Sequence, residues 1–224
     1  MSILLTVIAI ISVVELVRWI SNRISWGQET LPPPNINDIL SENYKPEECD
    51  KKMRVDCQNL LSQYFKEPED AEIYQRINEK LKNLNEDEKK ELLREIALKA
   101  SDIMHIKLDC IEFSNDPCMG AYYYKENKLM ISSAYLNQDS CRVELVKTIF
   151  HELKHAVQYN AISHGGNIWG YSDEKLISWV NNFQNYINCN YDPEGYLHQP
   201  VEIDSFGYEC SIIPQPGLSV NNNA

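Results

Sequence analysis

The chain has 224 residues, 43% of them hydrophobic and 13 of them tyrosine, which supports a packed core and excludes an intrinsically disordered chain. With 33 acidic and 21 basic residues the formal net charge is −12, which argues against nucleic acid as a partner because phosphate binding needs a basic surface. The seven cysteines include no C-x-x-C pair, which favours free thiols in a reducing compartment, with a disulfide framework as the alternative.

The first 26 residues contain the only strongly apolar run of the chain, residues 3–20. The run is near the lower length limit for crossing a bilayer, and Glu15 weakens it. We interpret residues 1–26 as a single-pass membrane anchor; an uncleaved or atypical export signal and a helix buried in the domain are the alternatives. Arg18 and Arg23 flank only the C-terminal side, so the positive-inside rule places the remaining chain in the cytoplasm.

A linker and a helical region are predicted to follow the anchor. Residues 27–36 contain three consecutive prolines and read as an extended linker. Residues 37–105 are highly charged, and their apolar residues recur at helical spacing. We expect a helical subdomain here, with helices near residues 53–65, 71–84 and 86–104 and with solvated charged faces.

Three short strands are predicted between this helical region and the centre of the chain. Residues 106–113 alternate in polarity, and residues 121–124 and 128–132 form a hairpin pattern around Lys125-Glu-Asn127. The alternative to a generic hairpin is an edge strand that pairs with an extended peptide substrate. We expect residues 106–213 to form the catalytic core of an α+β fold and residues 214–224 to form a disordered tail.

The central prediction is a helix that contains His151-Glu-Leu-Lys-His155, an H-E-x-x-H pattern. Asp139 or Ser140 is expected to cap its N-terminus, and apolar residues mark one face as core. Lys147 and Lys154, seven residues apart, are expected to mark a solvent-exposed face of this helix.

The H-E-x-x-H spacing has a direct chemical reading. His151 and His155 are four residues apart, so they lie on one helix face, one turn from each other, and can bind one Zn²⁺. Glu152 lies within the same arc and can act as general base on a water bound to the metal.

A catalytic zinc site needs a third protein ligand. Residues 173–187 are predicted to be a helix, residues 191–199 a loop, and residues 200–210 a short helix that starts with a proline. Glu202 on this last helix is the preferred third ligand, with Glu209 and His164 as alternatives. Asp204 is expected either to orient a ligand imidazole or to serve as a cap or surface charge.

These motifs together resemble the zincin metallopeptidases, and the downstream glutamate makes the chain most similar to the gluzincin branch. The similarity covers roughly residues 106–210 and extends to small bacterial and phage-associated zincin-like domains, including those akin to the peptidase half of phage-repressor-cleaving regulators. It departs from the thermolysin pattern, which has an Asn-Glu-x-x-x-Asp signature. The resemblance implies a zincin-like α+β fold in which a small antiparallel or mixed sheet packs on the H-E-x-x-H helix.

The resemblance also implies a function: zinc-dependent hydrolysis of a peptide or protein substrate, with Glu152 as general base. A further donor should stabilise the oxyanion, and His198, Tyr196 and Tyr208 are the candidates, with His198 preferred. The competing hypothesis is a zincin-like domain that binds a peptide or protein without cutting it. A helical protein in which the two histidines are incidental is the third reading.

Overall fold

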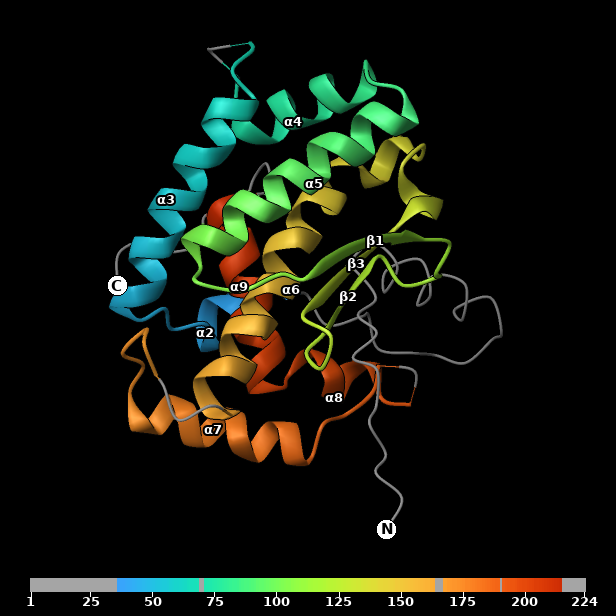
Figure 1. Ribbon diagram of the computed structural model, residues 1–224. Coiled ribbons are helices and arrows are strands. Elements are labelled where there is room, and N and C mark those ends of the chain that lie inside the picture. Colours follow the sequence, from blue (N-terminus) through green and yellow to red (C-terminus); the bar gives the residue numbers. More distant parts are fainter. Residues whose placement is uncertain (1–35, 69–70, 164–166, 190, 215–224) are drawn as a thin grey trace.

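The structure is a computed structural model that describes residues 36–68, 71–163, 167–189 and 191–214 (Figure 1). In chain order its elements are α2 (Ile36–Asn43), α3 (Glu48–Tyr64), α4 (Ile73–Lys82), α5 (Glu86–Ile103), β1 (Cys110–Ser114), β2 (Gly120–Tyr123), β3 (Lys128–Ser132), the 3₁₀ turns η1 (Ser133–Tyr135) and η2 (Asp139–Cys141), α6 (Arg142–Ser163), α7 (Asp173–Gln184), α8 (Pro193–Leu197) and α9 (Pro200–Ile212). The described chain is mostly helical with one small mixed sheet, which confirms the α+β class.

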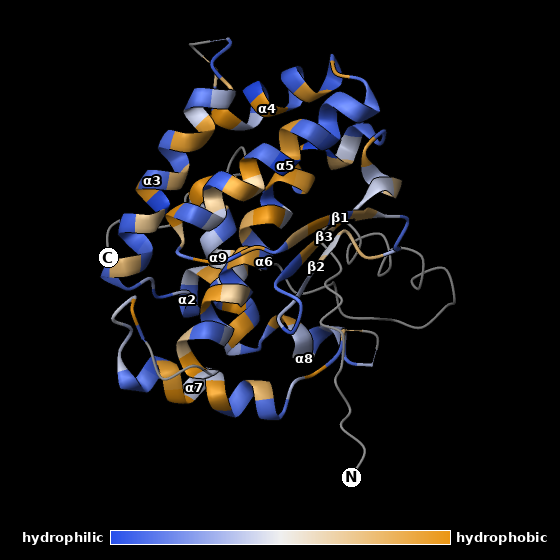
Figure 2. Cartoon of the chain, in the orientation of Figure 1, coloured by the Kyte–Doolittle hydropathy of each residue, from blue (hydrophilic) through white to orange (hydrophobic). Residues whose placement is uncertain are grey.

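The predicted helices before residue 105 are present as α3, α4 and α5, and their termini follow from local sequence. At the start of α5 the Asn85 side chain accepts a hydrogen bond from the Glu88 amide while the Glu88 carboxylate accepts one from the Asn85 amide. This reciprocal pair satisfies two amides that have no partner within the helix. Figure 2 shows hydrophilic and hydrophobic residues interleaved along α3, α4 and α5, as expected for helices with one buried face.

The larger hydrophobic cluster of the described residues joins these helices to the rest of the molecule. It contains Leu61 of α3, Leu93 of α5, Val146 of α6 and Ile212 of α9, each at most 1% exposed. Residues on both sides of position 106 therefore share one core, and α6 lies at its centre with α5 and α9 beside it (Figure 1).

The sheet has the strand order β1-β3-β2, with β1 parallel and β2 antiparallel to β3. The first strand begins at Cys110, later than the expected residue 106, because the chain first turns at the end of α5. There His105 has a φ of 56° and the Ile106 amide donates to the Ser101 carbonyl, so residues 106–109 precede the ladder. β2 is an edge strand that packs against α6.

The helix α6 carries the H-E-x-x-H residues and is buried along most of its length. It begins at Arg142, directly after η2, and not at a cap on Asp139 or Ser140. The expectation that Lys147 and Lys154 mark a solvent-exposed face is wrong, since the two residues are 1% and 0% exposed. Acidic residues on neighbouring helices cover that face and pair with both ammonium groups.

The C-terminal third differs from expectation in two places. The helix α7 ends at Gln184 and not at residue 187, because the Gln199 side chain binds both the amide and the carbonyl of Ile187. The expected loop at residues 191–199 contains α8, which begins with Pro193 and is capped by the Asp192 carboxylate on the Gly195 amide. The predicted helix at residues 200–210 is present as α9.

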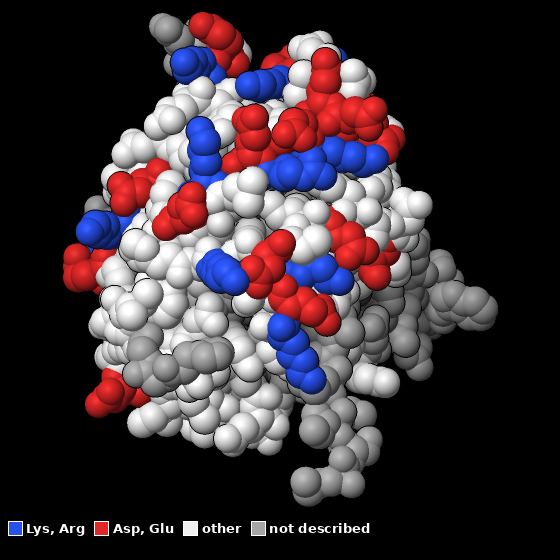
Figure 3. Space-filling model, viewed as in Figure 1, with Lys and Arg blue, Asp and Glu red and all other residues white. Residues whose placement is uncertain are grey.

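Several predictions fall outside the described residues, namely the membrane anchor at residues 1–26, nearly all of the linker, His164 and residues 215–224 of the tail. Within the described part of the chain, no helix combines the length and the hydropathy needed to cross a bilayer. On the face shown in Figure 3, acidic and basic side chains are interspersed, and many lie over the end that α4 and α5 form.

Candidate metal centre

Three buried side chains converge between α6 and α9. His151 and His155 come from one face of α6, and Glu202 comes from the first turn of α9. One ligand atom from each lies within 4.8 Å of the other two, and the three residues are at most 2% exposed. The three ligands predicted from the sequence therefore lie together. Among the described residues, they form the cluster of histidine and acidic side chains that could hold a metal ion.

The distances between these atoms are of the size found between the ligands of a zinc ion. The two Nε2 atoms are 3.1 Å apart, Nε2 of His151 lies 3.4 Å from Oε2 of Glu202, and Nε2 of His155 lies 3.4 Å from Oε1 of Glu202. Zinc–nitrogen bonds of about 2.0–2.1 Å at a tetrahedral angle place two ligand atoms about 3.3 Å apart. Each imidazole thus faces a different oxygen of one carboxylate, and two imidazoles with a carboxylate are a donor set that occurs in catalytic zinc sites.

Two tyrosines hold the Glu202 carboxylate in this position. The hydroxyl of Tyr186 donates to Oε1 at 2.7 Å, and the hydroxyl of Tyr196 donates to Oε2 at 2.6 Å. Burial of a charged carboxylate is costly unless it is paired, and here both oxygens have a donor as well as an imidazole neighbour. Tyr186 had no predicted role, because its expected position was the last turn of a helix.

The charges at the centre reinforce one another. Burial opposes ionisation of Glu202, but the nearby His155 and His151 outweigh it and hold the pKa of Glu202 well below its usual range. Burial lowers the pKa of His151, but Glu202 and Glu209 outweigh it and raise that pKa to about 10. Two acidic neighbours that attract a proton to His151 also attract a cation, so this cluster of side chains favours positive charge.

Glu152, the general base that the sequence predicts, follows His151 on α6. It is fully buried, and neither carboxylate oxygen accepts a hydrogen bond of normal geometry from the described residues. Burial raises its pKa to about 7, although the nearby His151 and His155 lower it. A carboxyl group with a pKa near neutrality can both accept and return a proton, which is the requirement for acid–base catalysis.

His155 is oriented by a different group than expected. Its Nδ1 lies 2.9 Å from Oε1 of Gln158 and 3.3 Å from the hydroxyl of Ser205. Asp204, which was considered for this role, accepts from Nε2 of Gln158 at 3.1 Å and so acts one side chain further away. Gln158 is three residues after His155, a spacing that places both on one helix face.

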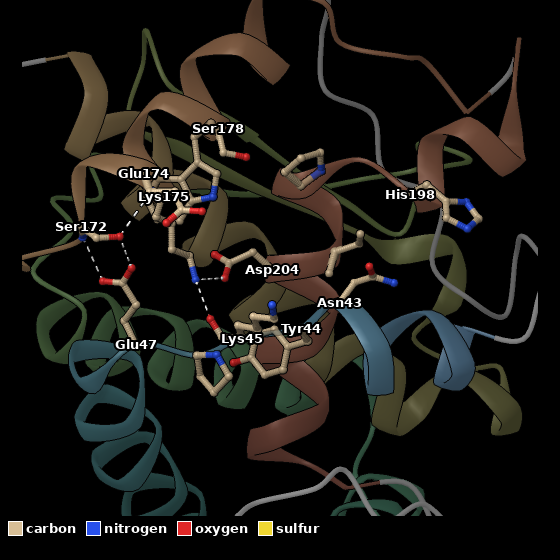
Figure 4. A pocket seen from close by; sticks show the side chains of 14 residues that line it. Asn43, Tyr44, Lys45, Glu47, Ser172, Glu174, Lys175, Ser178, His198 and Asp204 are labelled. Carbon is tan, nitrogen blue, oxygen red and sulfur yellow. Dashed lines mark hydrogen bonds and ion pairs between the residues drawn. The ribbon is translucent and has the colours of Figure 1, made fainter. Parts of the chain in front are cut away.

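The remaining predicted residues lie elsewhere. His198 caps the end of α8, is exposed, and its Nδ1 lies 2.9 Å from the Glu194 carbonyl. It lines a separate pocket of about 590 Å³, away from the Lys175–Asp204 pair (Figure 4). The hydroxyl of Tyr208 contacts the Cys57 thiol. Of the three predicted oxyanion donors, only Tyr196 touches a member of the metal centre.

A buried network of ion pairs lies next to the candidate ligands, around Lys154 of α6. Nζ of Lys154 lies 2.6 Å from Oδ1 of Asp50 and 3.0 Å from Oδ2 of Asp204, and the lysine is fully buried. Lys175 adds a second cation, 2.7 Å from Oδ1 of Asp204, in the pocket of Figure 4. The lysine inside the H-E-x-x-H pattern therefore links α6 to α3 and α9.

Comparisons of the chain with protein families, with curated proteins and with solved structures find no match.

Proposed function

We propose that this protein is a zinc-dependent metallopeptidase of the zincin type, in which His151, His155 and Glu202 bind the metal. The observation that carries the proposal is the convergence of two imidazole nitrogens, 3.1 Å apart, on the Glu202 carboxylate, whose two oxygens each lie 3.4 Å from one of them. The position of Glu152, next to His151 and without a hydrogen bond of normal geometry from the described residues, supports hydrolysis over a purely structural metal site.

The residues divide the chemistry between them. Bound zinc would lower the pKa of a water towards about 7 and polarise the scissile carbonyl. Glu152 accepts the proton of the attacking water and delivers it to the leaving amine. Tyr186 and Tyr196 keep Glu202 oriented and ionised while this occurs.

The substrate class proposed is an extended peptide. β2 is the edge strand nearest α6, and a Cβ placed on Gly120 would lie 3.4 Å from Cγ of Glu152, so the strand runs directly beside the proposed base. A peptide that adds to an edge strand is held by backbone hydrogen bonds, which position its carbonyl groups independently of its sequence.

The Glu152→Gln variant tests the mechanism. We expect the purified variant to retain one zinc per chain and to lose peptide hydrolysis by about 10²–10⁴-fold, because the amide keeps the shape of the side chain but cannot accept the proton. Metal analysis and a fluorogenic peptide library measure the two quantities. Unchanged hydrolysis in the variant would refute the mechanism, whereas zinc and peptide binding without turnover in the wild type would favour the silent peptide-binding domain.

Metal removal provides a second test of the site. Zinc that binds only the folded chain at 100 times its Kd should raise the free energy of unfolding by about 2.7 kcal/mol, and a chelator should reverse the gain. Urea unfolding with and without zinc measures this for the wild type and for His155→Ala. A gain of equal size in the variant would show that zinc binds elsewhere.

A further inference from the structure

Glu209, on the same face of α9 as Glu202 but two turns later, contacts the opposite side of the His151 ring. Its Oε2 lies 3.2 Å from Nδ1 of His151, whereas Nε2 of that ring faces Glu202 and His155. Glu209 is 4% exposed, so water does not compete freely for the contact. This placement separates Glu209 from the three converging ligand atoms and argues against its being the third ligand.

The other oxygen of Glu209 faces a buried cation. Nζ of Lys147 lies 4.0 Å from Oε1 of Glu209, and Lys147 precedes His151 by one helical turn. The ammonium group also lies 3.9 Å from Oε2 of Glu144 and 3.8 Å from the Cys210 sulfur. The ammonium group pairs with the Glu209 carboxylate and holds it between α6 and α9.

The two imidazoles are thus supported by different chemistry. Nδ1 of His155 contacts an uncharged amide, that of Gln158. Nδ1 of His151 lies next to the Glu209 carboxylate, which is paired with a lysine. A carboxylate can only accept from Nδ1–H, so it selects the tautomer whose Nε2 lone pair points into the centre.

We propose that Glu209 is a positioning residue of the metal centre, which holds the His151 ring through Nδ1 so that Nε2 can bind the ion, and that Lys147 anchors Glu209 in that position. The inference rests on the proposed zinc site and assigns the lysine–carboxylate–histidine arrangement a role in metal affinity. In the present geometry the Nδ1–H bond does not point straight at Oε2, and the 3.2 Å separation lets a rotation of either side chain align them.

Zinc affinity measured by competition with a chromophoric chelator tests the proposal. For Glu209→Gln we expect an affinity about 10–100-fold weaker than that of the wild type, the usual cost of losing such a support, and a larger loss for Glu209→Ala. The matched control is Glu144→Gln, which removes a buried carboxylate from the same lysine without touching His151. We expect the control to bind zinc as the wild type does.

The outcomes separate the possible failures. A wild type that binds no zinc refutes the proposed function itself. A wild type that binds zinc while Glu209→Gln binds it equally well refutes only the role of Glu209, and equal losses in Glu209→Gln and Glu144→Gln would attribute the effect to the buried lysine and not to contact with the imidazole.

A measurement on the unaltered protein covers the case in which the Glu209 variants do not fold. In the zinc-loaded wild type, a long-range ¹H–¹⁵N spectrum should show His151 protonated at Nδ1, with that proton protected from exchange with water. Coordination through Nδ1, or an Nδ1 proton that exchanges freely, would overturn the proposal.

Discussion

The two tyrosines that share the Glu202 carboxylate differ in their surroundings. Tyr196 lies on α8 and is 1% exposed, whereas Tyr186 lies after the end of α7 and is only partly buried. Burial raises the pKa of both phenols, and the Glu202 charge raises it further, so both remain donors at neutral pH.

For Tyr186→Phe we expect zinc affinity to fall about 10–100-fold, because the variant removes a hydrogen bond that orients the proposed ligand Glu202. Tyr196→Phe removes the equivalent hydrogen bond from the other oxygen and should weaken zinc binding as well. Zinc titration of the two variants measures both losses. A wild-type zinc affinity for Tyr186→Phe would show that its hydroxyl does not hold the ligand.

Much of the candidate metal centre can be predicted residue by residue. His151, Glu152 and His155 follow from helical spacing, and Glu202 follows from its place on a downstream helix. The structure does not bring His198 to this cluster, since it directly follows α8 and its ring contacts the Glu194 carbonyl. No local pattern distinguishes a loop histidine that faces a site from one that faces solvent.

At the scale of elements, the contact between β2 and α6 depends on a glycine. A Cβ on Gly120 would lie 2.3 Å from Cγ2 of Thr148 and 3.2 Å from the Met130 carbonyl oxygen. Thr148 is β-branched, buried on α6, and held by a hydrogen bond to the Glu144 carbonyl, so its methyl group has little freedom to yield.

We expect Gly120→Ala to lower the free energy of unfolding by about 1–3 kcal/mol, as overpacking does, and to displace β2 from Glu152. Thr148→Ser removes the obstructing methyl group and keeps the hydroxyl that binds the Glu144 carbonyl. The double variant should therefore recover most of the loss, which urea unfolding of both single variants and the double variant will measure. Stability of Gly120→Ala equal to that of the wild type would show that the strand does not need this close approach.

Across the whole molecule, the Lys154–Asp50 pair joins residues 104 positions apart. Burial raises the pKa of Asp50, but Lys154 and Lys175 outweigh it and leave the pKa below its usual value. A carboxyl group whose pKa is lower in the folded than in the unfolded state stabilises the fold above the unfolded pKa of about 3.9 and loses this contribution as the pH falls below it.

We expect Asp50→Asn to be less stable than the wild type by about 3–5 kcal/mol at pH 7, because it leaves part of a buried charge uncompensated. The difference should shrink as the pH falls through about 4 towards the folded pKa of Asp50, since the wild type then loses the same interaction. Urea unfolding of metal-free protein between pH 7 and pH 3 measures it, with Asp56→Asn, an exposed acid on the same helix, as control. A difference that does not change with pH would contradict the assignment.

The α+β class, the helices, the hairpin and the H-E-x-x-H spacing can be predicted from the sequence, because helical periodicity and turn chemistry are local. Which faces of α6 are buried depends on tertiary packing. Lys147 and Lys154 were predicted to face solvent because a lysine is usually exposed, yet both lie in the core opposite Glu209, Asp50 and Asp204. Buried ion pairs depend on the packing of α3 and α9 against α6, and contacts between residues so far apart in the chain leave no periodic signal in the sequence.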